Sequence, residues 1–178
     1  YGELDLLITE STYGLNDHPE RKDVENEFVS FAEEVTDKGG TLLVPAFAVG
    51  RSQEIACTLN NHNFSKPVVM DGMALKTNKI LRNNLECLKD SKAFLKTLDE
   101  LTIVKNWKQR KKILDTPSVI IAPAGMMVGG LSSFYKEGVI MNEKNAISLV
   151  SFQVEGTPGR ILLDKKMIRV NNKLKKIK

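Results

Sequence analysis

Residues 39–54 read GGTLLVPAFAVGRSQE, and this stretch decides the fold. Gly39 and Gly40 predict the end of a preceding helix, because glycine readily adopts the left-handed conformation found there. Residues 41–45 form an apolar run that suits a buried strand and is too short for a helix. Residues 50–59 then have the apolar spacing of another helix. This order is typical of a mainly parallel sheet covered by helices on both faces.

The same alternation continues along the chain. Further helices are predicted at residues 21–38, 73–88, 92–99 and 105–114, and another after residue 122 that ends near residue 138. Further strands are predicted at residues 4–9, 66–71, 101–104, 118–122, 146–152 and 161–163. The predicted fold class is therefore α/β, with a mainly parallel, Rossmann-like sheet and helices on both faces.

Polar or glycine-rich turns follow several of these predicted strands. They are residues 10–12, 45–51, 71–73 and 123–130. Parallel strands joined by right-handed crossovers end at one edge of the sheet, and open α/β sheets bind their ligands at that edge. We therefore expect these turns to gather in one site.

Composition places the chain among ordinary globular proteins, with 42% apolar and 27% charged residues in 178. No apolar run reaches the ~18 residues needed to span a bilayer, so no membrane partner is expected. The two cysteines, Cys57 and Cys87, lie in predicted helices, and such sparse use favours a cytoplasmic protein. Because the chain opens on Tyr1, we expect a fragment excised from a larger protein.

The net charge of +4 is unevenly distributed. One basic cluster surrounds Trp107, and a second forms the tail at residues 164–178. Such clusters can neutralise the phosphates of a nucleic acid. A solvated, lysine-rich face explains each cluster equally well.

Two common kinds of site are disfavoured. A dinucleotide site needs G-x-G-x-x-G after the first strand, where Glu10 would instead repel a pyrophosphate, and no G-x-x-x-x-G-K-[ST] loop is present. His18 and His62 are the only histidines, and no ligand set has the spacing of a zinc site.

Three residues have both a functional and a structural interpretation. Glu10 could end a strand in solvent, cap a helix or orient a catalytic partner. Arg51 begins a helix where free N–H groups and the dipole suit an anion, although Gly50 could simply pack closely and Glu54 could cap. Arg160 lies in the turn at residues 156–160, which offers a ligand a hydroxyl and a guanidinium or only connects two strands.

Several stretches, taken in order, resemble one known family. They are ITESTYG at residues 8–14, His18-Pro19 with Arg21 and Glu25, residues 39–54, VVMDGMA at 68–74, APAGMMVGG at 122–130 and VSFQVEGTPGR at 150–160. Together they are similar to the β-CASP domain of metallo-β-lactamase-fold ribonucleases, in the branch of archaeal relatives of the cleavage and polyadenylation specificity factor endonuclease. The resemblance runs from about residue 4 to residue 163.

The resemblance implies a β-CASP domain inserted into a metallo-β-lactamase domain, with RNA cut in the cleft between them. Two zinc ions would be held by an H-x-H-x-D-H motif and neighbouring motifs of the other domain, and no metal ligand is expected in this chain. Glu10 matches the first acidic motif of the family, whose carboxylate would orient a catalytic histidine. The H-x-H-x-D-H motif and the later histidine motifs are absent here, so we expect residues 1–178 to be an inactive single domain, with the tail leading back toward the missing one.

Residues expected at the edge of the predicted sheet suggest the contacts of the site. RNA contacts are expected from Arg51, Arg160, Thr157, Gly125, Gly129, Gly130, Ser132 and Ser133, and site-lining residues from Thr12, Tyr13, His18 and Arg21. The parent is expected to be a zinc-dependent endoribonuclease of RNA 3′-end processing, with 5′-exonuclease action and homodimer formation left open. The alternatives are a non-catalytic RNA-binding scaffold and a nuclease that acts on DNA.

Overall fold

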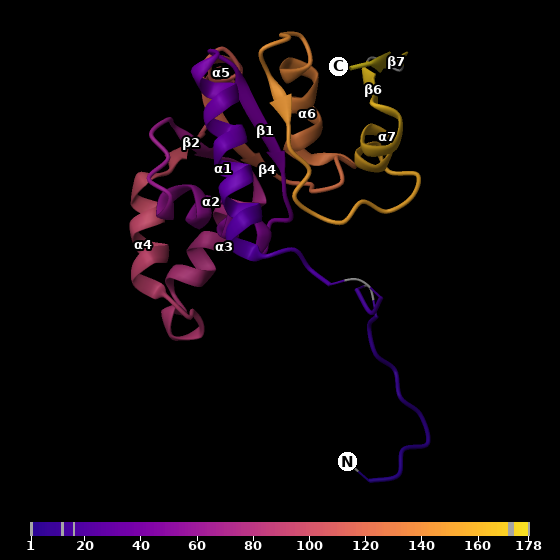
Figure 1. Cartoon of the computed structure of the whole chain (residues 1–178). Coiled ribbons are helices and arrows are strands. Elements are labelled where there is room, and N and C mark those ends of the chain that lie inside the picture. Colours follow the sequence, from indigo (N-terminus) through magenta and orange to yellow (C-terminus); the bar gives the residue numbers. More distant parts are fainter. Residues whose placement is uncertain (1, 12, 16, 171–172, 178) are drawn as a thin grey trace.

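A five-stranded parallel sheet forms the centre of the computed structural model, which describes residues 2–11, 13–15, 17–170 and 173–177 (Figure 1). Its strands are β1 (Thr41–Pro45), β2 (Val68–Met70), β3 (Thr102–Ile103), β4 (Ser118–Ala122) and β5 (Ala146–Ile147). They lie in the order β3-β2-β4-β1-β5, and every pairing is parallel. The predicted fold class is therefore confirmed.

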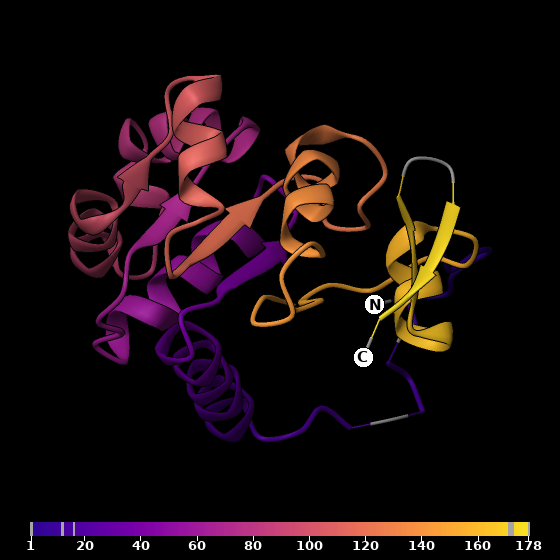
Figure 2. The same ribbon diagram turned by 90° about the horizontal axis from the view of Figure 1, so that it is seen from above.

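Helices connect the strands and lie on both sides of the sheet (Figure 2). They are α1 (Arg21–Asp37), α2 (Arg51–Asn61), α3 (Met73–Arg82), the short 3₁₀ helix η1 (Leu85–Cys87), α4 (Ser91–Glu100), α5 (Trp107–Ile113), α6 (Gly130–Val139) and α7 (Pro158–Lys165). No described helix is both long enough and apolar enough to cross a membrane.

The central strands are buried on both faces. In β1, Leu42 and Val44 pack in the cluster that includes α1 and α2, whereas Leu43 packs with Tyr135 and Val139 of α6 on the opposite face. Successive strand side chains point to opposite faces, so a strand between two helical layers has to be apolar throughout. This is why the uninterrupted apolar runs predicted β1 and β4.

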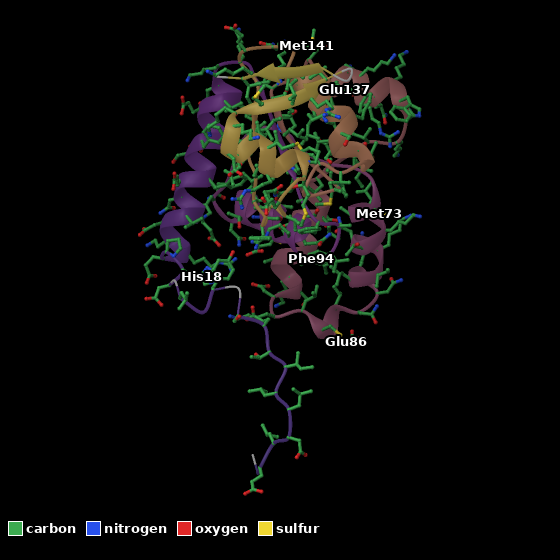
Figure 3. The ribbon with its side chains drawn as sticks, turned by 90° about the vertical axis from the view of Figure 1, so that its right-hand side faces the viewer. His18, Met73, Glu86, Phe94, Glu137 and Met141 are labelled. Carbon is green, nitrogen blue, oxygen red and sulfur yellow. The ribbon has the colours of Figure 1, made fainter. Side chains whose placement is uncertain are left out.

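The predicted strand at residues 4–9 is wrong for this chain. Residues 2–11 contain no helix or strand and extend away from the body of the molecule (Figures 1 and 3). Leu6 is 75% exposed and Ile8 is 86% exposed. A strand needs a neighbour that accepts its hydrogen bonds and a layer that covers its side chains, and no described strand pairs with this segment.

The predicted strand at residues 161–163 is also wrong, because these residues belong to α7. Thr157 caps this helix by accepting a hydrogen bond from the Arg160 N–H at 3.3 Å, and Pro158 occupies the first helical position. Of the predicted strand at residues 146–152, only Ala146–Ile147 pairs in the sheet.

The basic tail forms an antiparallel hairpin of β6 (Met167–Val170) and β7 (Lys173–Lys176). A small third core of Met127, Leu162 and Ile168 joins this hairpin and α7 to the body. Met127 belongs to the glycine-rich turn after β4, so the third core ties that turn to the C-terminal part of the chain.

Candidate functional site

Turns after β1, β2 and β4 pack together at the carboxyl edge of the sheet. A Cβ on Gly125 would stand 3.2 Å from the backbone nitrogen of Phe47, so the turn after β4 lies directly against the turn after β1. A Cβ on Gly72 would stand 3.0 Å from a methyl carbon of Leu131, so the turn after β2 meets the start of α6. We call these three turns, residues 45–51, 71–73 and 123–130, the rim.

The fourth predicted turn is not part of the rim. Glu10 is exposed in the extended segment, and Thr12 lies outside the described residues. Tyr13 is exposed, and its ring lies 4.1 Å, centroid to centroid, from the ring of His18 (Figure 3 labels His18 where the segment joins α1). Within the described part of the chain, no group of three or more His, Cys, Asp or Glu side chains could hold a metal ion.

The glycine-rich turn is held by the two serines that follow it. The Ser132 hydroxyl donates to the Ala124 carbonyl at 2.8 Å, and the Ser133 hydroxyl lies 3.0 Å from the Gly129 carbonyl. Ser132 is fully buried, which corrects the expectation that it contacts RNA, because its hydroxyl supports the turn from inside. Gly129 and Gly130 are exposed, and both have positive φ angles.

The start of α7 lies beside this turn. The Gly159 N–H donates to the Met126 carbonyl at 3.1 Å, and the buried Gln153 amide donates to the Gly125 carbonyl at 3.1 Å. Arg160 is therefore close in the fold to the glycine-rich turn. Its side chain is 40% exposed and pairs with Asp164 at 2.7 Å.

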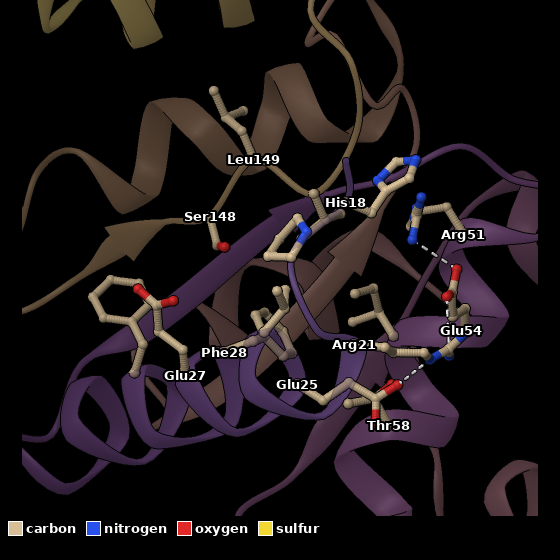
Figure 4. A pocket seen from close by; sticks show the side chains of 15 residues that line it. His18, Arg21, Glu25, Glu27, Phe28, Arg51, Glu54, Thr58, Ser148 and Leu149 are labelled. Atoms are coloured by element: carbon tan, nitrogen blue, oxygen red, sulfur yellow. Dashed lines mark hydrogen bonds and ion pairs between the residues drawn. The ribbon is translucent and has the colours of Figure 1, made fainter. Parts of the chain in front are cut away.

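His18, Arg21 and Arg51 come together in a cavity of about 630 Å³ between α1, α2 and residues 148–150 (Figure 4). We call this the α1–α2 cavity. Its apolar lining includes Val24, Phe28, Phe31, Ile55, Leu149 and Val150. Its charged lining includes both arginines and also Glu25, Glu27 and Glu54, so the cavity has no clear preference for an anion.

Both arginines of the cavity are already paired. Arg21 contacts Glu25 at 2.6 Å and Glu54 at 3.1 Å, and Arg51 contacts the same Glu54 at 2.7 Å (Figure 4). The backbone N–H groups of Arg51 and Ser52 donate to the carbonyls of Val49 and Phe47. The sequence predicted that these two N–H groups would be free for an anion, but both are already bonded within the turn. A phosphate at this helix start would therefore have to be bound by the exposed side chain of Arg51.

Acid is expected to weaken the Arg21–Glu25 pair. The hydrogen bond from Arg21 lowers the pKa of Glu25 below its ordinary value of 4.5. A lowered pKa contributes stability above the unfolded value, and this contribution disappears as the pH falls through the folded value. Arg21 is largely exposed, so the effect should be on the order of 0.5 kcal/mol. Urea unfolding of Glu25→Gln between about pH 6 and 3 should show a smaller acid loss than the parent chain.

The matched control is Glu27→Gln, which removes a carboxylate from the same helix and the same cavity. Glu27 forms no ion pair in the part of the chain that the structure describes. Equal acid profiles for the two variants would contradict a stabilising role for the Arg21–Glu25 pair.

A buried polar network that sequence reasoning missed supports the rim from below. Asp71 is 1% exposed and accepts two hydrogen bonds from Arg110, at 2.6 and 2.9 Å, and one from the Tyr135 hydroxyl at 2.8 Å. Burial, and then the bond to Asp71, raise the pKa of Tyr135 far above its usual range, so its hydroxyl remains a donor. The network joins the carboxyl end of β2 to α5 and α6.

Comparison with known proteins identifies the chain at the level of its domain. The family model described as the Beta-Casp domain matches residues 52–162, which is more than half of the chain. The chain belongs to the Beta-Casp domain family. The matched region contains β2, β4 and β5, the rim turns after β2 and β4, and the start of α7. β1 and the turn after it precede this region.

Individual relatives of this Beta-Casp chain are archaeal. It is 43% identical over 163 residues to RNase aCSPSF2 of Saccharolobus solfataricus, covering 92% of this chain and 33% of that protein. It is 37% identical to Probable RNase MJ4 of Methanocaldococcus jannaschii, covering 91% of this chain and 39% of that protein. Transcription termination factor FttA of the same organism is 37% identical, with 90% and 28% covered. The chain thus spans about a third of the length of these relatives.

Proposed function

We propose that this Beta-Casp chain is the RNA-binding half of a zinc-dependent ribonuclease that acts in RNA 3′-end processing. The observation that carries the proposal is the gathering of the rim turns at one edge, with Arg51 at one of them and Arg160 beside another. Two of the relatives are named as RNases, and a third is named as a transcription termination factor, which supports an RNA substrate. Arg51, Arg160, Thr157 and the exposed Gly129 and Gly130 would contact the RNA.

The metals would lie elsewhere in the parent protein. The described residues do not fit a zinc site, so two zinc ions would be bound by a domain outside this chain. The length of the relatives beyond the matched third supports such a domain. Glu10 would act together with that domain, because it lies in the segment that extends away from the body.

Exposed apolar side chains on the rim support a neighbouring domain facing this edge. Phe47 is 43% exposed, Met73 63% and Val128 60%, and these residues belong to the turns after β1, β2 and β4. Contiguous exposed apolar surface commonly marks an interaction site. The rim would therefore face the second domain, and the RNA would lie between the two domains.

Replacing Arg51 or Arg160 with alanine is expected to weaken RNA binding and to flatten its salt dependence. Each phosphate contact on a single strand contributes a slope of about −0.7 in log K against log salt, so each variant should reduce the slope by about that amount. Fluorescence anisotropy of a labelled single-stranded RNA, titrated with this chain at several salt concentrations, measures the slope.

Lys38→Ala is the matched control, because it removes a cation that pairs with Glu34 at the far end of α1. Its slope should equal that of the parent chain. Unchanged slopes for Arg51→Ala and Arg160→Ala would contradict their role as phosphate contacts. The same RNA, incubated with the chain and Zn²⁺, should stay intact on a denaturing gel, and cleavage would contradict placing the metals in another domain.

A further inference from the structure

Trp107, at the start of α5, is held firmly and is nevertheless exposed. The Arg110 guanidinium lies 4.7 Å from the centre of its ring, and the Phe134 ring lies edge-on to it at 5.1 Å between centroids. Trp107 is 57% exposed. An indole that is fixed by neighbours and open to solvent offers an aromatic surface that loses little conformational freedom when a ligand stacks on it.

The position of Trp107 is set by the buried network beneath the rim. Arg110 is locked by its two hydrogen bonds to Asp71, and Asp71 is held in turn by Tyr135. Phe134, which contacts Trp107, also packs edge-on against Tyr135 at 5.3 Å. Because Asp71 directly follows β2, this network ties Trp107 to the same carboxyl edge that carries the rim.

Lysines surround the exposed indole, and no acidic residue lies between residues 101 and 114. The exposed lysines are Lys105, Lys108, Lys111 and Lys112. None of the four forms an ion pair in the described part of the chain. The surface of α5 therefore differs from the α1–α2 cavity, where glutamates already pair with the arginines.

We propose that Trp107 is a stacking platform for a base of single-stranded RNA and that the four lysines bind the adjacent phosphates. An exposed aromatic ring among unpaired cations is the combination that binds single strands, because each base has a face to stack and each phosphate a charge to neutralise. In a duplex the bases are already stacked on one another, which disfavours a double-stranded ligand. This inference rests on the proposed RNA-binding function and extends the RNA path from the rim onto α5.

The chain contains a single tryptophan, so its intrinsic fluorescence reports on Trp107 alone. Titration of this chain with a uridine dodecamer, excited near 295 nm, should quench the tryptophan emission as the RNA binds. Anisotropy of the same oligonucleotide with a fluorescent label measures affinity independently. Trp107→Ala should weaken that affinity by about tenfold, and Trp107→Phe, which retains a ring, should recover most of the loss.

A charge-matched pair of variants tests the lysines. Lys108→Ala/Lys111→Ala/Lys112→Ala should reduce the salt slope by about 2, since each lost contact is worth about 0.7. Lys89→Ala/Lys92→Ala/Lys96→Ala removes equal charge at and before α4 and should change the slope much less. Far-UV circular dichroism and the urea midpoint verify that each variant is folded.

The outcomes separate this inference from the function on which it rests. RNA binding by anisotropy without tryptophan quenching, or with equal affinity for Trp107→Ala and the parent, would overturn the stacking platform and leave the proposed function standing. An absence of any RNA binding by anisotropy would overturn both. Equal slopes for the two triple-lysine variants would overturn the phosphate track along α5.

Discussion

Replacing Asp71 with alanine is expected to lower the free energy of unfolding by about 3–5 kcal/mol, because it leaves a largely buried guanidinium without its carboxylate. Arg110 is only 16% exposed and donates both of its side-chain bonds to Asp71. The buried Tyr135 hydroxyl loses its acceptor in the same substitution. Urea unfolding followed by far-UV circular dichroism measures the change.

Companion variants separate the charge from the packing. Tyr135→Phe removes one hydrogen bond and should cost about 1–2 kcal/mol. The double variant Asp71→Ala/Arg110→Met removes both charges and should be more stable than Asp71→Ala alone, since no buried ion is left unpaired. An Asp71→Ala variant that loses less than about 1 kcal/mol would contradict the importance of the network.

Replacing Gly130 with alanine is expected to destabilise the chain by about 2–4 kcal/mol. Its φ angle of +67° is unfavourable for a residue with a side chain, at about 1–2 kcal/mol. A Cβ there would also stand 2.8 Å from the Pro123 carbonyl oxygen and 3.0 Å from the Ala124 nitrogen. Relieving this contact has to move the backbone of the turn, which adds about 1–2 kcal/mol of overpacking. Chemical unfolding measures the loss, and RNA anisotropy measures the effect on binding.

Gly129→Ala provides the matched control. Its φ angle is +70°, nearly the same, but a Cβ there would meet nothing within 4 Å. The clash is absent, but at ψ −163° Gly129 occupies a backbone region that almost only glycine adopts, so strain alone should cost this variant about 1–3 kcal/mol. A loss below about 1 kcal/mol for Gly130→Ala would contradict the close approach of Gly130 to the Pro123 carbonyl.

The sequence predicts the fold best where a strand is buried on both faces. The runs at residues 41–45 and 118–122 match β1 and β4 residue for residue, because helices on both sides of the sheet require apolar side chains throughout. The segment at residues 4–9 is also mainly apolar, yet no described strand pairs with it. Apolar character predicts that a run can be buried and does not identify its partner.

The local sequence contained a signal against the strand that was predicted at residues 161–163. Residues 161–163 are apolar, but Thr157-Pro158 just before them is a typical helix start, with a capping hydroxyl and a proline at the first position. This pattern outweighs the tendency of a short apolar run to form a strand.

The rim could be predicted because parallel strands end at one edge, which brings together turns far apart in the chain. The network of Asp71, Arg110 and Tyr135 could not be predicted in this way. The three side chains come from different elements, and one sequence holds no information about which carboxylate a given arginine meets. Ser132 was expected to contact RNA because it follows the glycine-rich turn at the predicted sheet edge, whereas its hydroxyl turns inward to the Ala124 carbonyl.

The strand order also determines how early the central sheet can fold while the chain is being synthesised. β1 is made first, yet both strands that flank it, β4 and β5, come much later in the chain. A nascent chain that ends before residue 118 contains only the β2–β3 pairing, so both edges of β1 lack a strand partner and the face that packs on α6 is uncovered. Pairings between distant segments slow folding, because a long loop must close before the contacts form. The centre of the sheet therefore assembles only after β4 leaves the ribosome.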